Sequence, residues 1–122
     1  MSKTLLLVED SSVARKILER SLSKCMKEPF DLLHASNLSQ AEQLINDNNV
    51  QLIFLDLNLN QESGFDFLKS IRDKENHTPV IIISSDMKGE TVNKSNQYGV
   101  TEFVNKPFTI EQIEQSLDKV LA

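Results

Sequence analysis

The chain has 122 residues, with 13 Lys and Arg against 18 Asp and Glu, so its formal charge is −5. This length fits one domain spanning residues 1–122, and a content of 39% hydrophobic and 25% charged residues is typical of a globular protein. The acidic balance argues against direct binding to nucleic acid, and the single cysteine excludes an internal disulfide and favours a reducing, cytoplasmic compartment.

We expect no membrane segment. Unbroken apolar runs such as Leu5–Val8 and Val80–Ile83 are far shorter than the roughly 20 residues that a membrane-spanning helix needs. The first residues also lack the pattern of a secretory signal.

Short apolar runs predict the strands of a sheet. Several of them are continuous rather than alternating, which is typical of strands that are covered on both faces in a parallel sheet. The predicted strands are Thr4–Val8, Phe30–Ala35, Val50–Leu55, Val80–Ser84 and Thr101–Val104.

Helical patterns separate these runs. Apolar residues recur at spacings of three and four, and capping boxes at Ser39–Glu42 and Thr109–Gln112 predict two of the helix starts. We expect the third helix to be ended by Pro79. The predicted inward faces are Ala14, Ile17, Leu18, Ser21, Leu22 and Cys25; then Ala41, Leu44 and Ile45; then Gly64, Phe67, Leu68 and Ile71; and lastly Ile110, Ile113, Leu117, Val120 and Leu121.

The segment Met87–Tyr98 has a weak pattern of its own. Its clearly apolar positions are Val92 and Tyr98, and a polar run from Asn93 to Asn96 occupies its middle. We predict a helix there because strands and helices alternate elsewhere in the chain. Its polarity leaves open whether this helix is mobile or adapted to an unusual partner.

Alternating strands and helices predict an α/β fold with a doubly wound, five-stranded parallel sheet of the flavodoxin-like order 2-1-3-4-5. In such sheets, ligands bind beyond the carboxyl ends of the strands, where the strand order reverses. The first and third predicted strands are followed by Glu9, Asp10 and Asp56, and the last two strands lead to Ser84 and Lys106.

Carboxylates that converge on one edge repel each other unless positive charge neutralises them. A hard divalent cation with oxygen ligands, above all Mg²⁺, suits Glu9, Asp10 and Asp56. Together with the Lys106 ammonium and the Ser84 hydroxyl, the cluster favours phosphoryl transfer in which a carboxylate is the nucleophile. Isolated acids often only solvate strand ends, but three acids directly after buried runs favour a site.

On these residues the chain resembles the receiver domains of bacterial two-component response regulators, and chemotaxis regulators among them. The resemblance spans nearly the whole chain and is carried by Glu9-Asp10, Asp56, Gly64, Ser84 and Lys106-Pro107-Phe108 in this order and spacing. It implies a phosphorylated signalling switch that catalyses only its own phosphorylation and dephosphorylation.

The resemblance also implies roles for single residues. Asp56 would accept phosphate from a phosphohistidine on a sensor histidine kinase or a histidine phosphotransfer protein. Asp10 would bind Mg²⁺ directly, Glu9 would bind it through water, and the backbone carbonyl of Asn58 would supply a further ligand.

Other roles implied by the resemblance concern the switch. Ser84 would bond the acyl phosphate, Lys106 would pair with it, and the peptide bond before Pro107 would be cis. Phe103 would rotate inward when Ser84 moves, and the alternative is that its ring is a permanent part of the core. Asn58 and Asp86 would flank the attacking water and give a phosphate lifetime of seconds to minutes, unless Asp86 is only a helix N-cap.

Two histidines and the cysteine are left outside the predicted site. His34 and His77 are expected to lie away from the strand-end cluster, in surface or packing roles. Cys25 is expected to be a small buried apolar residue.

Three rival functions use similar architectures and can be compared with the residues present. A nucleotide binder would need a Gly- or Ser/Thr-rich turn after the first strand, where Glu9-Asp10 stand, and a haloacid-dehalogenase-type phosphatase would need an acid where Asn58 stands. The third rival is a receiver-like interaction module that is never phosphorylated. The output is also open, because a binding partner or a downstream domain could supply it.

Overall fold

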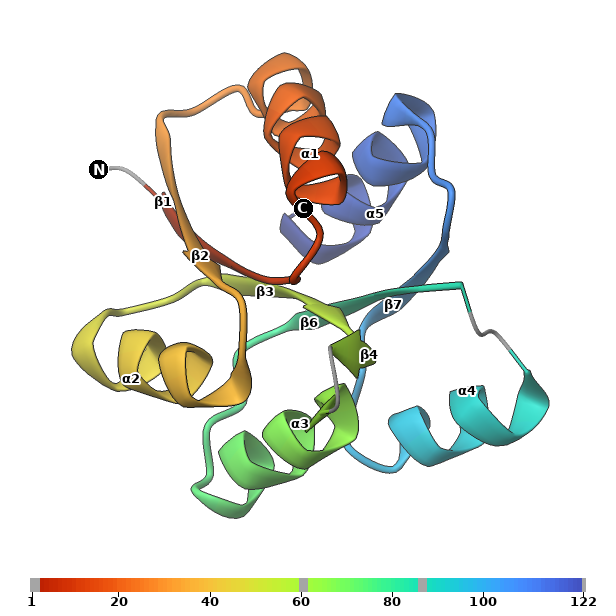
Figure 1. Ribbon diagram of the computed structural model, residues 1–122. Coiled ribbons are helices and arrows are strands. Elements are labelled where there is room, and N and C mark those ends of the chain that lie inside the picture. The colour runs from red at the N-terminus through yellow and green to blue at the C-terminus, as the bar shows by residue number, and fades with distance from the viewer. Residues whose placement is uncertain (1–2, 60–61, 86–87, 122) are drawn as a thin grey trace.

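Five parallel strands form the central sheet of the computed structural model, which describes residues 3–59, 62–85 and 88–121 (Figure 1). The strand order is β2-β1-β3-β6-β7. Since β6 and β7 are the fourth and fifth strands of this sheet along the chain, the predicted order 2-1-3-4-5 is confirmed. The strands are β1 (Lys3–Val8), β2 (Phe30–Ala35), β3 (Leu52–Asp56), β6 (Val80–Ser84) and β7 (Glu102–Asn105).

Helices cover both faces of the sheet, so the molecule has three layers. In Figure 1, α1 and α5 lie on one face, and α2, α3 and α4 lie on the other. The helices are α1 (Ser12–Cys25), α2 (Leu38–Asp47), α3 (Gly64–Asp73), α4 (Gly89–Asn96) and α5 (Ile110–Leu121). No helix in the described part of the chain is long and apolar enough to cross a membrane.

Each central strand sends alternate side chains into two separate cores. Leu5 and Leu7 of β1 belong to the cluster under α1 and α5, whereas Leu6 and Val8 belong to the cluster under α2 and α3. All residues of β3 and β6 are buried. This two-sided burial explains the continuous apolar runs of the sequence.

Strand β1 begins at Lys3, one residue before the predicted start, and two other strands differ from the prediction at both ends. The third strand begins at Leu52 rather than Val50 and includes Asp56, and the fifth strand starts and ends one residue later than predicted. The register decides both, because hydrogen-bonded pairing with β6 extends to Asp56 opposite Ile83 on one side and to Asn105 opposite Ser84 on the other. Asp56 is therefore the last residue of β3 and is held by the sheet.

Capping at the helix ends confirms one predicted start and corrects another. At α5 the Thr109 hydroxyl accepts from the Gln112 N–H, and the Gln112 side chain accepts from the Thr109 N–H, as the capping box predicted. The box predicted at Ser39 is wrong, because the Asn37 side chain accepts from the Gln40 N–H and α2 begins at Leu38. Asn is at least as good an N-cap as Ser, so the earlier residue starts the helix.

Two further details of the helix prediction are wrong. Helix α3 ends at Asp73, before Pro79, and Glu75 then turns the chain with a φ of +61°. Ile17 is 45% exposed and lies at the margin of the inward face of α1, which is centred on Leu18 and Leu22.

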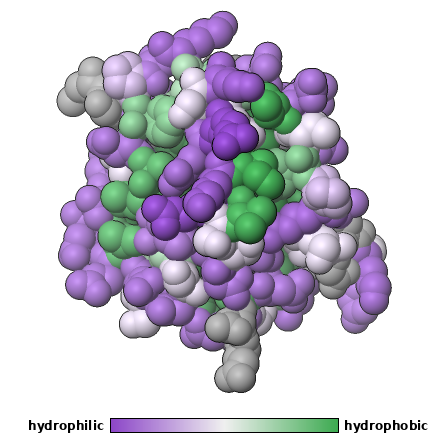
Figure 2. Space-filling view, turned by 45° about the horizontal axis from the view of Figure 1, so that its top comes forward, coloured by the Kyte–Doolittle hydropathy of each residue, from purple (hydrophilic) through white to green (hydrophobic). Residues whose placement is uncertain are grey.

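The face of the molecule turned forward in Figure 2 is mostly hydrophilic, with separate apolar patches.

Helix α4 confirms the prediction made from its neighbours and is the most polar of the five helices. Its N-cap residue, Lys88, does not cap the helix through its side chain, and the buried residue among the described positions of the helix is Ser95. The Lys94 ammonium lies 4.4 Å from the centre of the Phe65 ring and so connects α4 to α3. Few apolar contacts hold this helix on the sheet.

A short hairpin that the sequence did not predict follows Asp56. Strand β4 (Asn58–Leu59) pairs antiparallel with β5 (Glu62–Ser63), and α3 begins at the next residue, Gly64. The Gly64 N–H donates to the Leu57 carbonyl at 2.9 Å. A Cβ atom on Gly64 would lie 2.4 Å from the carbonyl oxygen of Asp56, so only glycine lets the hairpin close here.

We expect Gly64→Ala to destabilise the fold by about 1–3 kcal/mol, because the new methyl group overlaps backbone atoms that the sheet holds in place. Urea unfolding measures this loss. The matched control is Gly89→Ala in α4, where an added Cβ meets nothing within 4 Å. Equal stability of the two variants would contradict the tight approach of α3 to β3.

Candidate functional site

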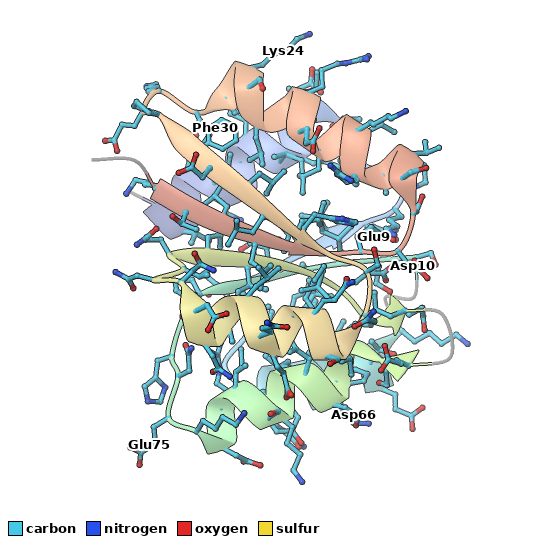
Figure 3. All side chains as sticks on the ribbon, turned by 60° about the vertical axis from the view of Figure 1, so that its left-hand side comes forward. Glu9, Asp10, Lys24, Phe30, Asp66 and Glu75 are labelled. Atoms are coloured by element: carbon cyan, nitrogen blue, oxygen red, sulfur yellow. The ribbon has the colours of Figure 1, made fainter. Side chains whose placement is uncertain are left out.

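The carboxyl ends of the strands bring the predicted chemical groups to one edge of the sheet. Glu9 follows β1, Asp56 and Ser84 are the last residues of β3 and β6, and Lys106 follows β7. Figure 3 shows Glu9 and Asp10 at this edge, between the first turn of α1 and the β4–β5 hairpin. Parallel pairing of β1, β3, β6 and β7 makes these ends meet.

Three acids form a compact cluster at this edge. One carboxylate oxygen from each of Glu9, Asp10 and Asp56 lies within 4.8 Å of the others. Glu9 and Asp56 are buried, with 2% and 5% exposure, while Asp10 is exposed. An all-oxygen ligand set with one side open to water fits Mg²⁺, which is bound by a few carboxylates and keeps several waters.

Lys106 links the two buried acids. Its ammonium group donates to the Glu9 carboxylate at 2.5 Å and to Oδ2 of Asp56 at 3.0 Å. The side chain is 22% exposed, so one side of the ammonium group remains accessible. A single cation, on the residue that follows β7, thus connects the residue that follows β1 with the last residue of β3.

The pKa values of Glu9 and Lys106 are both raised, for different reasons. Burial raises the pKa of Glu9, and the nearby charge of Asp56 adds to this, although hydrogen bonds from Lys106 and Ser11 oppose it. Burial by itself would lower the pKa of Lys106, but the hydrogen bonds and charges of Glu9 and Asp56 together raise it. The site therefore keeps Lys106 charged and has room for further positive charge.

Backbone N–H groups orient both buried carboxylates. Oε1 of Glu9 accepts from the Ser11 N–H at 3.0 Å, and Oδ1 of Asp56 accepts from the Asn58 N–H at 3.0 Å. Each acid is thus bonded to the loop that follows its own strand. The Ser11 hydroxyl also caps α1 by accepting from the Ala14 N–H, so the start of this helix is tied to Glu9.

The switch residues of the prediction lie on the two neighbouring strands. Ser84 is fully buried, and its carbonyl accepts from the Lys106 N–H at 2.9 Å. The peptide bond between Lys106 and Pro107 is cis, as predicted. Phe103 is partly buried and packs against the core under α2 and α3.

Of the two residues predicted to control phosphate lifetime, the structure describes Asn58. Asn58 has an exposed side chain at the start of the hairpin, two residues beyond Asp56. Asp86 lies outside the described residues. Helix α4 begins at Gly89, with Lys88 as its N-cap residue.

The prediction that His34 lies away from the strand-end cluster is wrong. Its ring nitrogen Nε2 lies 2.7 Å from the backbone oxygen of Glu9. The signal was available in the pairing of strands, because β2 runs parallel to β1 and places His34 opposite Leu7. His77 is exposed in the loop between α3 and β6, and Cys25 is only partly buried at the end of α1.

Comparisons with known proteins agree with this geometry. The model of the response regulator receiver domain matches residues 5–118. The response regulator DctR of Priestia megaterium is 30% identical over 117 residues, which are 95% of this chain and 50% of DctR. The chain thus spans about half the length of this curated relative.

Solved structures show the same fold. The signal receiver domain of a LuxO repressor protein from Vibrio parahaemolyticus has a TM-score of 0.89 and 30% identity, covering 99% of this chain and 91% of that one. The Mn²⁺-bound form of response regulator Rcp1 has a TM-score of 0.82 and 22% identity, covering 95% of this chain and 92% of that one. The chain belongs to the response regulator receiver domain family, whose members are signalling domains of two-component systems.

Proposed function

We propose that the chain is a phosphorylation-controlled switch that accepts phosphate on Asp56 in a Mg²⁺-dependent reaction. The observation that carries this proposal is the placement of the Asp56 carboxylate, 3.0 Å from the Lys106 ammonium and beside Glu9 and Asp10. A carboxylate held between a cation and a metal-binding acid pair is suited to attack a phosphoryl group.

The donor in this proposal is a phosphohistidine. A carboxylate oxygen of Asp56 forms a bond to phosphorus while the bond between phosphorus and the imidazole nitrogen breaks. The imidazole leaves with that electron pair and takes up a proton, and Asp56 becomes an acyl phosphate. To end the signal, a water oxygen bonds to the phosphorus while the bond between phosphorus and the Asp56 oxygen breaks. The Asp56 carboxylate, inorganic phosphate and a proton are released.

The chain's own residues position and neutralise the phosphoryl group. Asp10 would hold Mg²⁺ directly, Glu9 through water, and Asp56 and the Asn58 carbonyl would complete the protein ligands. The ion supplies charge neutralisation for the phosphoryl oxygens when bound. Lys106 moves from its two carboxylate partners to a phosphate oxygen, and the Ser84 hydroxyl donates to another. Phe103 rotates inward when Ser84 moves.

The partners follow from this chemistry. A sensor histidine kinase or a histidine phosphotransfer protein would supply the phosphate in the cytoplasm. DctR is twice the length matched by this chain, so the output of such regulators need not reside in the receiver. A binding partner or a downstream domain would carry the signal onward from this chain.

We expect the protein to gain a single phosphate when it is incubated with Mg²⁺ and a small acyl phosphate donor. Intact-mass spectrometry detects the addition, which Asp56→Asn or removal of Mg²⁺ by a chelator should abolish. The matched control is Asp66→Asn, which changes an exposed acid in the first turn of α3 and should leave the yield unchanged. A wild-type protein that stays unmodified would favour a docking module that is never phosphorylated.

We expect the phosphorylated form to decay within seconds to minutes, because the polar side chains of Asn58 and Asp86 favour the approach of water. Replacing Asn58 with Leu, which cannot orient water, should lengthen the lifetime severalfold. The decay is followed by mass spectrometry after the donor is removed, with Asn48→Leu at the end of α2 as the control. A wild-type lifetime of hours would contradict the assigned roles.

We expect the site to make the metal-free protein less stable as the pH rises above the ordinary Glu pKa of 4.5. Because the pKa of Glu9 is raised in the folded state, this state binds more protons than the unfolded state in that window, and stability falls with pH until Glu9 is ionised in both. Urea unfolding from about pH 4 to 7 should show that Glu9→Gln loses this decline. Glu19→Gln, on the exposed part of α1, is the control, and parallel curves for wild type and Glu9→Gln would contradict the shift.

A further inference from the structure

The Glu9 carbonyl accepts a hydrogen bond from a side chain that nothing so far connects with function. Nε2 of His34 lies 2.7 Å from this oxygen. A carbonyl oxygen can only accept, so Nε2 carries the hydrogen. His34 is partly buried on β2, which lies at the edge of the sheet next to β1.

The hydrogen-bonding pattern of the sheet explains why this carbonyl needs a donor. Beyond the last residue of β1, the Glu9 N–H still donates to the Ala35 carbonyl at 3.0 Å. If the parallel ladder continued, the Asn37 N–H would donate to the Glu9 carbonyl. At Asn37, however, the chain leaves the sheet as the N-cap of α2, and the imidazole of His34 provides a donor to this carbonyl instead.

The bond acts on the peptide unit that joins the two acids. The Glu9 carbonyl belongs to the planar Glu9–Asp10 peptide, so fixing its oxygen fixes the orientation from which Asp10 starts. The Glu9 side chain is already held by Lys106 and by the Ser11 N–H. Asp10 is exposed and begins at this peptide unit, so the position of its Cα follows the orientation of the peptide.

We propose that His34 is a positioning residue that orients the Glu9–Asp10 peptide so that the Asp10 carboxylate faces Asp56 for binding Mg²⁺. This inference rests on the proposed function, since it assigns the metal to the acid cluster. Outer partners of metal ligands typically contribute tenfold or more to metal affinity. His34 reaches Asp10 through one peptide unit and not by contact with its carboxylate, so we expect an effect on Mg²⁺ affinity at the lower end of this range.

The test compares two replacements of His34 that differ in their ability to donate. His34→Phe keeps a ring of similar size without a donor, whereas His34→Gln keeps an N–H group. Mg²⁺ alone is the probe, and its Kd is measured by calorimetry beside the free energy of unfolding in chelator. We expect about tenfold weaker Mg²⁺ binding for His34→Phe and recovery of most of the affinity in His34→Gln.

The matched control is His77→Phe, which changes the other histidine at an exposed position remote from the acids and should leave the Kd unchanged. If His34→Phe does not fold, His34→Leu takes its place as the variant without a donor. Equal Mg²⁺ affinity of the wild type and the donor-free variant would overturn the positioning role alone. A wild-type protein that does not bind Mg²⁺ would instead overturn the proposed function, and this inference with it.

Discussion

The ammonium group of Lys106 is the contact on which the arrangement of the site depends. It bonds to Glu9 and Asp56, so one cation joins the ends of β1, β3 and β7. Two carboxylates buried this deeply would repel each other without it, and removing one partner of such a pair is costly. One ammonium against the three acids of the cluster still leaves an excess of negative charge. This excess of negative charge is what makes the cluster suited to a divalent cation.

The sheet supplies the rigidity that this charge cluster needs. The central strands are buried on both faces, and their parallel register delivers Asp56 and Ser84 to neighbouring positions at one edge. The loops beyond that edge are then held by few bonds: the Asn58 N–H to Asp56, the Ser11 N–H to Glu9, and the close approach of Gly64 to the Asp56 carbonyl. The residues of the site thus lie at strand ends and in the loops that follow, whose starting points are fixed by the core.

The opposite side of the site has a different character. Helix α4 contributes a single buried residue among its described positions, Ser95, and leans on α3 through Lys94 and Phe65. Beyond its end, the Arg72 guanidinium of α3 donates to the carbonyls of Tyr98 at 2.6 Å and Thr78 at 3.0 Å, which fixes the turn into β7. A helix with little apolar burial belongs to the low-stability part of a fold. Along the chain, α4 connects β6, which ends at Ser84, with β7, which contains Phe103.

The sequence by itself indicated the strands, most residues of the inward helix faces and the residues at the strand ends, because continuous apolar runs and polar strand ends are local patterns. The alternation of strands and helices predicted the strand order. The sequence also indicated the Thr109 cap and the site acids. Tertiary structure alone decided what depends on pairing across the chain: that Asp56 lies within β3, and that Lys106 reaches Glu9 across 97 positions. His34 is the clearest case. Nothing local marks it, and only the parallel register of β2 with β1 brings its imidazole to the Glu9 carbonyl.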